Sequence, residues 1–399
     1  MTTAESLPQL PFQQDHILQV PPDYLRLLRD ERPITRIRSA VGDEVWLATR
    51  YADVRALLAD PRLGRSHPEP ENAPRFTGSV FLGGPEGSYD TEKQEHTRLR
   101  RVLTPSFSAR RMTALRPRVR GLANELLDQI EAEGPPADLH ERLAFTLPVL
   151  VICELLGVPA GERARFRTWS TKMASLTDVN LAVEAYVEFA AYMRQLVEVK
   201  RAEPAEDVIS DLIAADEQWH FGIDEITRLS VALLFAGHET TMTRIDLGTV
   251  LLLSNPDQMA ALRADESLVR GAVEEILRMT MGGQTGVPRY AHEDIEIGGV
   301  TIRAGDGVVL NTDVSSRDER VFAEPDRFDI TRAAGTPHLA FGHGAHFCIG
   351  ASLARIELQE VFSLLLRRFP SLRLAVPVSE LRPRTGTITA GLRELPVAW

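Results

Sequence analysis

The sequence predicts a mainly helical protein with a small β portion, and three observations lead to this fold class. Apolar residues recur with the period of an amphipathic helix through most of the chain after residue 90. Runs of residues that suit β-strands are short and few. These runs do not alternate with helical segments in the rhythm of a parallel sheet. We therefore expect one large α-rich domain over residues 1–399, with a small β-rich lobe at approximately 30–60, 290–312 and 372–395.

The N-terminal part of the chain contains short elements and one long loop. A coil reaches Val20, and Pro22 stands at the first position of a helix, where proline is favoured. The elements expected here are a helix at Tyr24–Arg29, strands at Ile34–Ile37 and Val45–Ala48, and a helix at Tyr51–Ala59. Residues 65–89 are rich in proline, glycine and asparagine and have no period, which indicates a long loop.

Helical periodicity dominates the remainder of the chain. Helices are expected at Thr91–Val102, Ala109–Glu133, Glu141–Leu156, Gly161–Leu176, Asn180–Ala202, Glu206–Ala215, Asp224–Ser254, Pro256–Ala264, Ser267–Met279 and Gly350–Phe369. Short strands are expected at Ile295–Ile297, Thr301–Ile302, Gly307–Asn311, Leu372–Leu374 and Thr387–Gly391.

The composition excludes several classes of protein. Apolar residues make up 44% of the chain and charged residues 25%, as in an ordinary globular protein. The net charge of −11 argues against nucleic-acid binding, which requires a basic surface. Two cysteines are too few for a disulfide framework, which favours a reducing cytoplasm. Because no secretory signal or membrane-spanning stretch is evident, we expect a cytoplasmic protein that does not bind membranes.

The stretch from Phe341 to Gly350 carries the strongest chemical signal in the chain. It contains Cys348 and several glycines, which allow a backbone to lie close to a flat ligand. A thiolate in such a loop can be the axial ligand of haem iron. Two other interpretations stay open, namely a zinc site that joins His343 and His346 to Cys348, or a buried structural thiol.

This stretch resembles the haem-binding loop of the cytochrome P450 family. The family pattern F-x-x-G-x-x-x-C-x-G is met at every fixed position, by Phe341, Gly344, Cys348 and Gly350. The resemblance extends over essentially the whole chain. It implies the cytochrome P450 fold, with haem b (iron protoporphyrin IX) between a long central helix and the cysteine loop, and with Cys348 as the axial ligand.

The central helix expected at Asp224–Ser254 contains a second signal. Asp224 is its expected N-cap, and at about 1.5 Å per residue the helix would be roughly 45 Å long. Residues 236–241 read Ala-Gly-His-Glu-Thr-Thr, and a glycine, an acid and two hydroxyls within an apolar helix are locally inconsistent. Such inconsistencies often mark functional sites.

This segment resembles the A-G-x-D/E-T-T/S motif of the same family. The resemblance implies that Ala236 and Gly237 border the haem and that Glu239 and Thr240 relay protons to bound O₂. The alternative is a packing glycine beside an exposed glutamate.

The resemblance also implies four anchors for the haem propionates. These are His96 and Arg100 on one helix face, Arg289 just before the strand region that begins at Ala291, and His346 in the cysteine loop. Arginine and histidine suit this role because their N–H groups bind carboxylates.

A structural cluster is implied by two further motifs. Glu275 and Arg278 match the family's E-x-x-R, and Arg327 lies in a Pro-Asp-Arg-Phe segment that supplies the third member. A buried carboxylate between two guanidiniums would stabilise the core.

The activity implied by the resemblance is that of a haem-thiolate monooxygenase. It would insert one oxygen atom of O₂ into a hydrophobic small molecule by hydroxylation or epoxidation, and the sequence most resembles actinobacterial enzymes that tailor polyketides and macrolides in antibiotic biosynthesis. Substrate-pocket positions would be Phe81, Leu233, Leu234, Val287 and Ile388, although each could equally pack in the core. The glycine-rich stretch 282–286 and the loop at 65–89 would leave room for a bulky substrate.

Electrons would come from a separate ferredoxin and ferredoxin reductase. A basic surface is the docking candidate, formed by Arg98, Arg101, Arg110 and Arg111. Alternative functions are a haem-thiolate binding or sensor protein without turnover, and a peroxide-driven peroxygenase.

Overall fold

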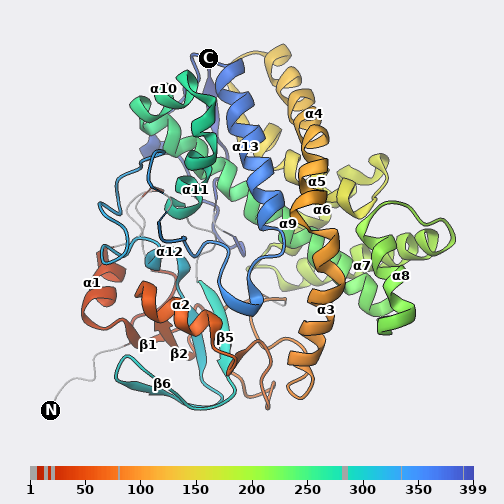
Figure 1. Ribbon diagram of the computed structural model, residues 1–399, viewed down its shortest axis with the longest axis vertical. Helices are drawn as coiled ribbons and strands as arrows, with labels where there is room; N and C mark the ends of the chain where they lie inside the picture. The colour runs from red at the N-terminus through yellow and green to blue at the C-terminus, as the bar shows by residue number, and fades with distance from the viewer. Residues whose placement is uncertain are drawn as a thin grey trace. The chain divides into compact units, whose positions relative to one another are not determined.

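The computed structural model describes residues 7–12, 17–18, 23–79, 81–280, 286–333, 335–389 and 391–399 (Figure 1). The expected helix start at Pro22 and most of the glycine-rich stretch 282–286 lie outside the described residues. The chain divides into two compact units that are each discontinuous in sequence. The first unit comprises residues 1–94, 277–328 and 333–348, and the second comprises residues 95–276, 329–332 and 349–399.

A mixed sheet organises the first unit. Its strands follow the order β1-β2-β8-β5-β3 among the described residues. They are β1 (Ile34–Arg38), β2 (Glu44–Ala48), β8 (Gly307–Leu310), β5 (Val287–Ala291) and β3 (Leu63–Gly64). The β2 and β8 strands are parallel, with Trp46 opposite Val308, whereas the other neighbours are antiparallel.

Both faces of this sheet are buried, as the alternation along β8 shows. Val308 and Leu310 pack into one hydrophobic cluster, and the intervening Val309 packs into another. Successive strand side chains point to opposite faces, so an uninterrupted apolar run indicates a strand covered on both sides. Helices α1 (Asp23–Glu31) and α2 (Tyr51–Ala59) contribute to these clusters.

A hairpin and two short helical segments complete the first unit. Strands β6 (Ile295–Ile297) and β7 (Val300–Ile302) pair antiparallel across Gly298 and Gly299. Both glycines have positive φ, at 57° and 79°, which the tight hairpin turn requires. The helical segments are α12 (Thr312–Ser315) and a 3₁₀ turn, η4 (Gly344–His346).

The second unit is almost entirely helical. Its α-helices include α3 (Glu92–Ser106, of which the first residues belong to the first unit), α4 (Ala109–Glu133), α5 (Thr146–Leu156), α6 (Arg163–Met173), α7 (Val179–Ala202), α8 (Val208–Trp219), α9 (Gly222–Ser254), α10 (Pro256–Ala264), α11 (Val269–Met279, which ends in the first unit) and α13 (Ala351–Arg368). A π-helical turn, η1 (His140–Ala144), precedes α5, and 3₁₀ turns occur at η2 (Ala160–Glu162), η3 (Glu266–Leu268) and η5 (Val378–Glu380). A small sheet joins β4 (Ala137–Asp138), β10 (Pro396–Ala398) and β9 (Arg373–Leu374).

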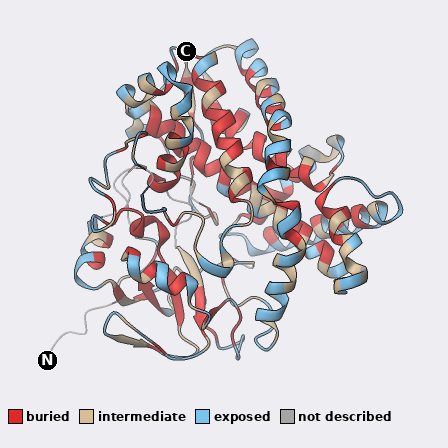
Figure 2. Cartoon of the chain, in the orientation of Figure 1, coloured by how far each residue is buried: buried red, intermediate tan, exposed pale blue. Residues whose placement is uncertain are grey.

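Helix α9 forms the core of this second unit. It packs against α5, α7 and α13, and nearly every residue from His238 to Leu252 is buried, as Figure 2 shows. Helix α13 packs against both α4 and α9 and is also largely buried. Together these contacts confirm the predicted mainly helical fold class.

Several expected boundaries differ from those observed. Helix α9 begins at Gly222, so Asp224 lies in its first turn rather than at the N-cap, where its charge still favours the helix dipole. The strand expected at Thr387–Gly391 is replaced by isolated bridges at Thr387 and Pro383 among the described residues, whereas β10 was not expected.

Strand β5 was also missed, because Pro288 interrupts its pattern and proline is unusual inside a sheet. Arg289 therefore lies within β5 and not before the strand region.

Candidate active site

The cysteine loop, from Phe341 to Gly350, includes the C-terminal end of the first unit at Cys348. The N–H of Phe347 donates to the carbonyl of Gly344 at 3.1 Å, and the N–H of Cys348 donates to the carbonyl of Phe341 at 2.9 Å. These bonds fold the loop back on itself and leave Cys348 exposed.

Gly344 has a structural reason to be glycine. Its φ is +73°, and a Cβ at this position would lie 2.9 Å from both the Cα of Ala59 and the carbonyl oxygen of Leu58. The loop therefore lies directly against the end of α2, where only glycine fits. His343, His346 and Cys348 do not form a three-residue metal-ligating group in the described part of the chain.

Arg289 is a buried cation that forms no ion pair among the described residues. Its side chain on β5 is 6% exposed, and its hydrogen bond goes to the carbonyl of Pro288 at 2.7 Å. Burial lowers the pKa of Arg289 to about 10. A buried guanidinium whose hydrogen bond goes to a neutral carbonyl suits a carboxylate ligand, because charge-assisted bonds are stronger than neutral ones.

The donor chemistry of the first unit therefore fits a haem. The exposed Cys348 supplies a thiol that can ligate iron. Arg289 and the half-buried His346 supply N–H donors of the kind that propionates need.

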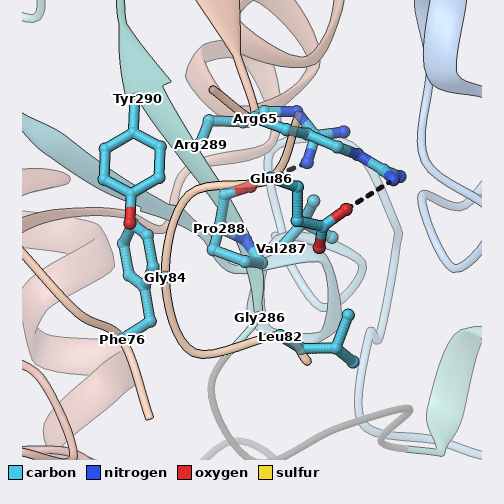
Figure 3. Close-up of a pocket in the computed structure, with 10 residues that line it drawn as sticks. All are labelled: Arg65, Phe76, Leu82, Gly84, Glu86, Gly286, Val287, Pro288, Arg289 and Tyr290. Atoms are coloured by element: carbon cyan, nitrogen blue, oxygen red, sulfur yellow. Dashed lines mark hydrogen bonds and ion pairs between the residues drawn. The ribbon is translucent and has the colours of Figure 1, made fainter. Parts of the chain in front are cut away.

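A cavity of about 200 Å³ lies beside Arg289 in the first unit (Figure 3). Its lining is mainly apolar and aromatic, with two arginines and one acid: Arg65, Phe76, Leu82, Gly84, Glu86, Gly286, Val287, Pro288, Arg289 and Tyr290. Arg65 and Glu86 form an ion pair of 3.3 Å at its edge. Of the five expected pocket positions, Val287 lines this cavity, whereas Phe81 is not among its lining residues.

The motif on α9 presents different side chains to different surroundings. Gly237 faces α5, since a Cβ there would lie 3.0 Å from Cδ1 of Ile152. Ala236 and Thr240 are exposed, and the Thr240 hydroxyl donates to the carbonyl of Ala236 at 3.0 Å. Thr241 makes the same kind of backbone bond to Gly237, at 3.2 Å. Hydroxyl bonds to the preceding turn compete with the helix ladder and often bend a helix.

Glu239 is buried, which excludes the alternative of a surface glutamate. It is 1% exposed. Its Oε2 accepts a hydrogen bond from the hydroxyl of Thr389 at 2.5 Å and lies 3.4 Å from the guanidinium of Arg384. Its other oxygen has no hydrogen-bond partner in the described part of the protein. Thr389 and Arg384 are contacts that sequence reasoning did not identify.

The remaining expected residues of the second unit lie in several elements. His96 and Arg100 are half-buried and stand one turn apart on α3. Leu233 and Ile388 are half-buried, so either can border a cavity. Leu234 is 1% exposed, which favours a packing role.

Glu275 of the expected structural cluster pairs with an arginine that was not among the expected members. Glu275 is buried and pairs through both oxygens with Nε of Arg332, at 3.2 and 3.1 Å. It also accepts the N–H of Asp329 at 3.0 Å. Arg332 lies outside any motif, and only the fold brings it to Glu275.

The two arginines of the expected cluster make contacts in the first unit. Arg278 donates to the carbonyls of Ser316 and Pro325, at 3.1 and 2.7 Å. Arg327 pairs with Glu324 at 3.1 Å on an exposed surface.

Two of the four arginines of the expected docking surface bind acids of their own chain. Arg98 pairs with Glu225 at 2.5 Å and lies over the Phe221 ring. Arg111 pairs with Asp211. Their charges are therefore partly neutralised within the second unit.

Comparisons with known proteins identify the family of this chain. The family model described as "Cytochrome P450" matches residues 166–383. Pentalenolactone synthase of Streptomyces exfoliatus is 43% identical over 98% of this chain and 99% of its own. Mycinamicin IV hydroxylase/epoxidase of Micromonospora griseorubida is 42% identical over the whole length of both chains.

Solved structures agree as well. CYP105P1 in complex with filipin I has a TM-score of 0.91 and 41% identity, and 99% of each chain is covered. PimD, described as a polyene macrolide antibiotic pimaricin epoxidase, has a TM-score of 0.88 and 41% identity over 99% of this chain and 100% of its own.

The chain belongs to the cytochrome P450 family and has the fold of that family. It is accordingly a monooxygenase that uses haem. Family membership rejects the zinc interpretation of Cys348. In the described part of the chain, no helix is both long and apolar enough to span a membrane.

Proposed function

We propose that this cytochrome P450 hydroxylates or epoxidises a hydrophobic substrate of polyketide or macrolide type, as a tailoring step in antibiotic biosynthesis. The mainly apolar lining of the cavity beside Arg289 supports a hydrophobic ligand, because such a ligand gains free energy by leaving water. Relatives named as a mycinamicin hydroxylase/epoxidase and a pimaricin epoxidase support the substrate class.

The cofactor is proposed to be haem b, with Cys348 as its axial ligand. Phe341, Gly344 and Gly350 shape the loop that presents the thiolate. The propionates would be held by four cationic or N–H-donating side chains: His96, Arg100, Arg289 and His346. When bound, the haem supplies the activation of O₂ and the transfer of one oxygen atom to a C–H or C=C bond.

The chain's own contribution to the chemistry is to hold and move protons. Thr240 would hold a proton at its hydroxyl, which the carbonyl of Ala236 orients. Glu239 would supply that proton from its buried carboxyl group, which Thr389 and Arg384 position. Positioned acids and alcohols of this kind are general acid catalysts.

Electrons are proposed to come from a separate ferredoxin and ferredoxin reductase in the cytoplasm. Arg101 and Arg110 remain exposed on the basic surface and support this docking. The scarcity of cysteine supports a reducing compartment.

The reduced, CO-bound absorbance spectrum tests the cofactor assignment. We expect a strongly red-shifted Soret band in the wild-type protein, lost in Cys348→His and kept in the matched variant Cys153→Ala, which removes a buried thiol in α5. A Soret band typical of histidine ligation in the wild type would refute it. The substrate class is tested by the shift in haem spin state on adding a macrolide, and no shift with any macrolide or linear polyketide would contradict it.

A further inference from the structure

A cluster of buried ionisable side chains surrounds Glu239 within the second unit. His238, Glu239 and Asp246 lie on α9, His140 lies on η1, and Arg384 lies in the C-terminal segment. The three α9 residues are each 1% exposed or less, and His140 is 7% exposed. Burying charged groups costs free energy unless they are paired, so a cluster of this size requires an explanation.

His140 and Asp246 form the most direct pair in this cluster. Nδ1 of His140 lies 2.7 Å from Oδ2 of Asp246. Burial lowers the pKa of His140, but the hydrogen bond to Asp246 and its charge outweigh burial, and the pKa is raised above the usual 6.5. Burial also raises the pKa of Asp246, which the hydrogen bond from His140 only partly offsets. The two groups are hydrogen-bonded and therefore bind and release protons as a coupled pair.

Arg384 connects this pair to Glu239. A Cβ at Gly391 would lie 3.7 Å from Oδ2 of Asp246 and 3.9 Å from Cδ of Arg384, so both side chains border the same glycine. The guanidinium of Arg384 lies 3.4 Å from Glu239 on its other side. Arg384 therefore pairs with Glu239, and its charge also acts on Asp246, whose pKa it lowers against the larger effect of burial.

His238 occupies the other flank of Glu239. Its Nδ1 forms a hydrogen bond with the hydroxyl of Ser170 at 2.8 Å. Its ring packs edge-on against the ring of Phe145, with 4.5 Å between the two ring centroids. Burial lowers the pKa of His238 to about 4, so this imidazole is neutral at physiological pH. A neutral imidazole can both donate and accept a hydrogen bond.

Three polar atoms of the cluster lack a hydrogen-bond partner in the described part of the protein. They are Nε2 of His238, Oε1 of Glu239 and Oδ1 of Asp246. Glu239 and Asp246 are two helical turns apart and so lie on one face of α9. Buried polar groups are almost always satisfied, and where the protein offers no partner an ordered water usually does so.

We propose that the His140–Asp246 pair is an internal proton reservoir that resupplies Glu239 through buried water, with His238 and Arg384 as positioning residues. The proposal rests on the proposed role of Glu239. When Glu239 has given up a proton, the protonated pair passes one proton through water to Glu239 and is left as a neutral imidazole beside a carboxylate. His140, which is 7% exposed, then takes one proton from solvent. Each transfer moves one proton and no electron.

The charged neighbours of the His140–Asp246 pair favour proton transfer from this pair toward Glu239. Burial has the largest single effect on the pKa of His140 and lowers it, and the charge of Arg384 lowers it further. Asp246 on α9 and Asp138 on β4 raise this pKa, and together they outweigh burial and Arg384. Burial lowers the pKa of His238, and the charge of Glu239 opposes this effect. The positive charges of Arg384, His140 and Arg167 lower the pKa of His238 further. The cationic state is therefore held at His140 and not at His238, which places the stored proton at the end nearest solvent.

The pairing is tested by nuclear magnetic resonance titration of the His140 imidazole in the purified full chain. Asp246→Asn should lower the pKa of His140 by about one to three units, the usual effect of losing an adjacent opposite charge. Asp207→Asn is the matched control, because Asp207 pairs with Lys200 in the same unit with similar burial, and asparagine keeps its N-cap of α8. An unchanged His140 titration in Asp246→Asn would overturn the proposal.

The supply of protons is tested by the pH profile of peroxide release. The probe is hydrogen peroxide formed per NADPH oxidised, with a plant-type ferredoxin and ferredoxin reductase as electron donors. Asp246→Asn should shift the rise in peroxide to lower pH by about the same one to three units, whereas Asp207→Asn should not. Superimposable profiles for the two variants would overturn the proposal even if the His140 pKa moves.

Failure of the proposed function gives a different result. A wild-type Soret band typical of histidine ligation, or a Thr240→Ala variant with unchanged peroxide release, would reject the thiolate site or the relay. The His140 titration does not depend on haem chemistry, so it reports on the pair in either case.

Discussion

Replacing Arg332 by methionine should destabilise the protein far more than an ordinary surface substitution. The change removes the Arg332 guanidinium, whose Nε contacts both oxygens of the Glu275 carboxylate, a side chain that is 2% exposed. Breaking a buried ion pair from one side costs about 3–5 kcal/mol because it strands a buried charge. The N–H of Asp329 still binds Glu275 at 3.0 Å, so we expect the lower end, about 3 kcal/mol. Total stabilities are only about 5–15 kcal/mol.

The assay is urea unfolding, compared through the free energy of unfolding of each variant. Arg142→Met is the control, because the Arg142–Glu133 pair is about half exposed at 51% and 46% and should contribute about 1 kcal/mol or less. Adding Glu275→Gln to Arg332→Met removes the stranded charge and should recover part of the loss. The reasoning is refuted if Arg332→Met costs no more than Arg142→Met, or if the double variant recovers nothing.

Three further predictions follow from individual sites. Gly344→Ala should impose left-handed strain of about 1–2 kcal/mol and a contact with the backbone of α2, and so lower the fraction of thiolate-type Soret absorbance; an unchanged spectrum and unfolding midpoint would contradict this. Thr240→Ala should raise peroxide release per NADPH, because the hydroxyl that would deliver the proton is lost. The only bond removed with it in the described part of the chain is the one to the Ala236 carbonyl one turn away, so the fold should be unaffected; unchanged peroxide release per NADPH would remove Thr240 from the relay. Burial raises the pKa of Glu92, but hydrogen bonds from the Ser66 hydroxyl and two backbone N–H groups outweigh it and hold the pKa below 4.5. Stability from this carboxylate is therefore present above pH 4.5 and lost as the pH falls below it, and Glu92→Gln should flatten that acid limb of the unfolding free energy; an identical limb would be the contrary result.

Three helices were predicted with their observed bounds, and local signals mark the ends of two of them. The bounds of α2, α4 and α10 agree with the sequence prediction. In α4, the Ser108 hydroxyl accepts the N–H of Arg111 and Gly134 follows the last turn with a positive φ. Proline opens α10 at its first position. Such signals act within a few residues, so they can be read without knowledge of the fold.

The family was likewise visible in sequence, because its motifs are contiguous. The cysteine loop and the Ala-Gly-His-Glu-Thr-Thr segment each lie within ten residues or fewer, and they led to the family that the comparisons confirm. The roles of Glu239, Thr240 and the propionate anchors remain predictions. The structure adds the surroundings of these residues, above all the burial of Glu239.

The sequence by itself therefore determined the family, most helices and the residue types of the site. Only the tertiary structure decided which distant side chains meet: Arg332 with Glu275, Arg384 and Thr389 with Glu239, and His140 with Asp246, 106 residues away. It also decided that β5 pairs as a strand despite its proline, since β8 and β3 lie on either side of it. The physical reason is that burial and pairing depend on contacts across the whole chain, and local patterns of charge and hydrophobicity do not specify the partner.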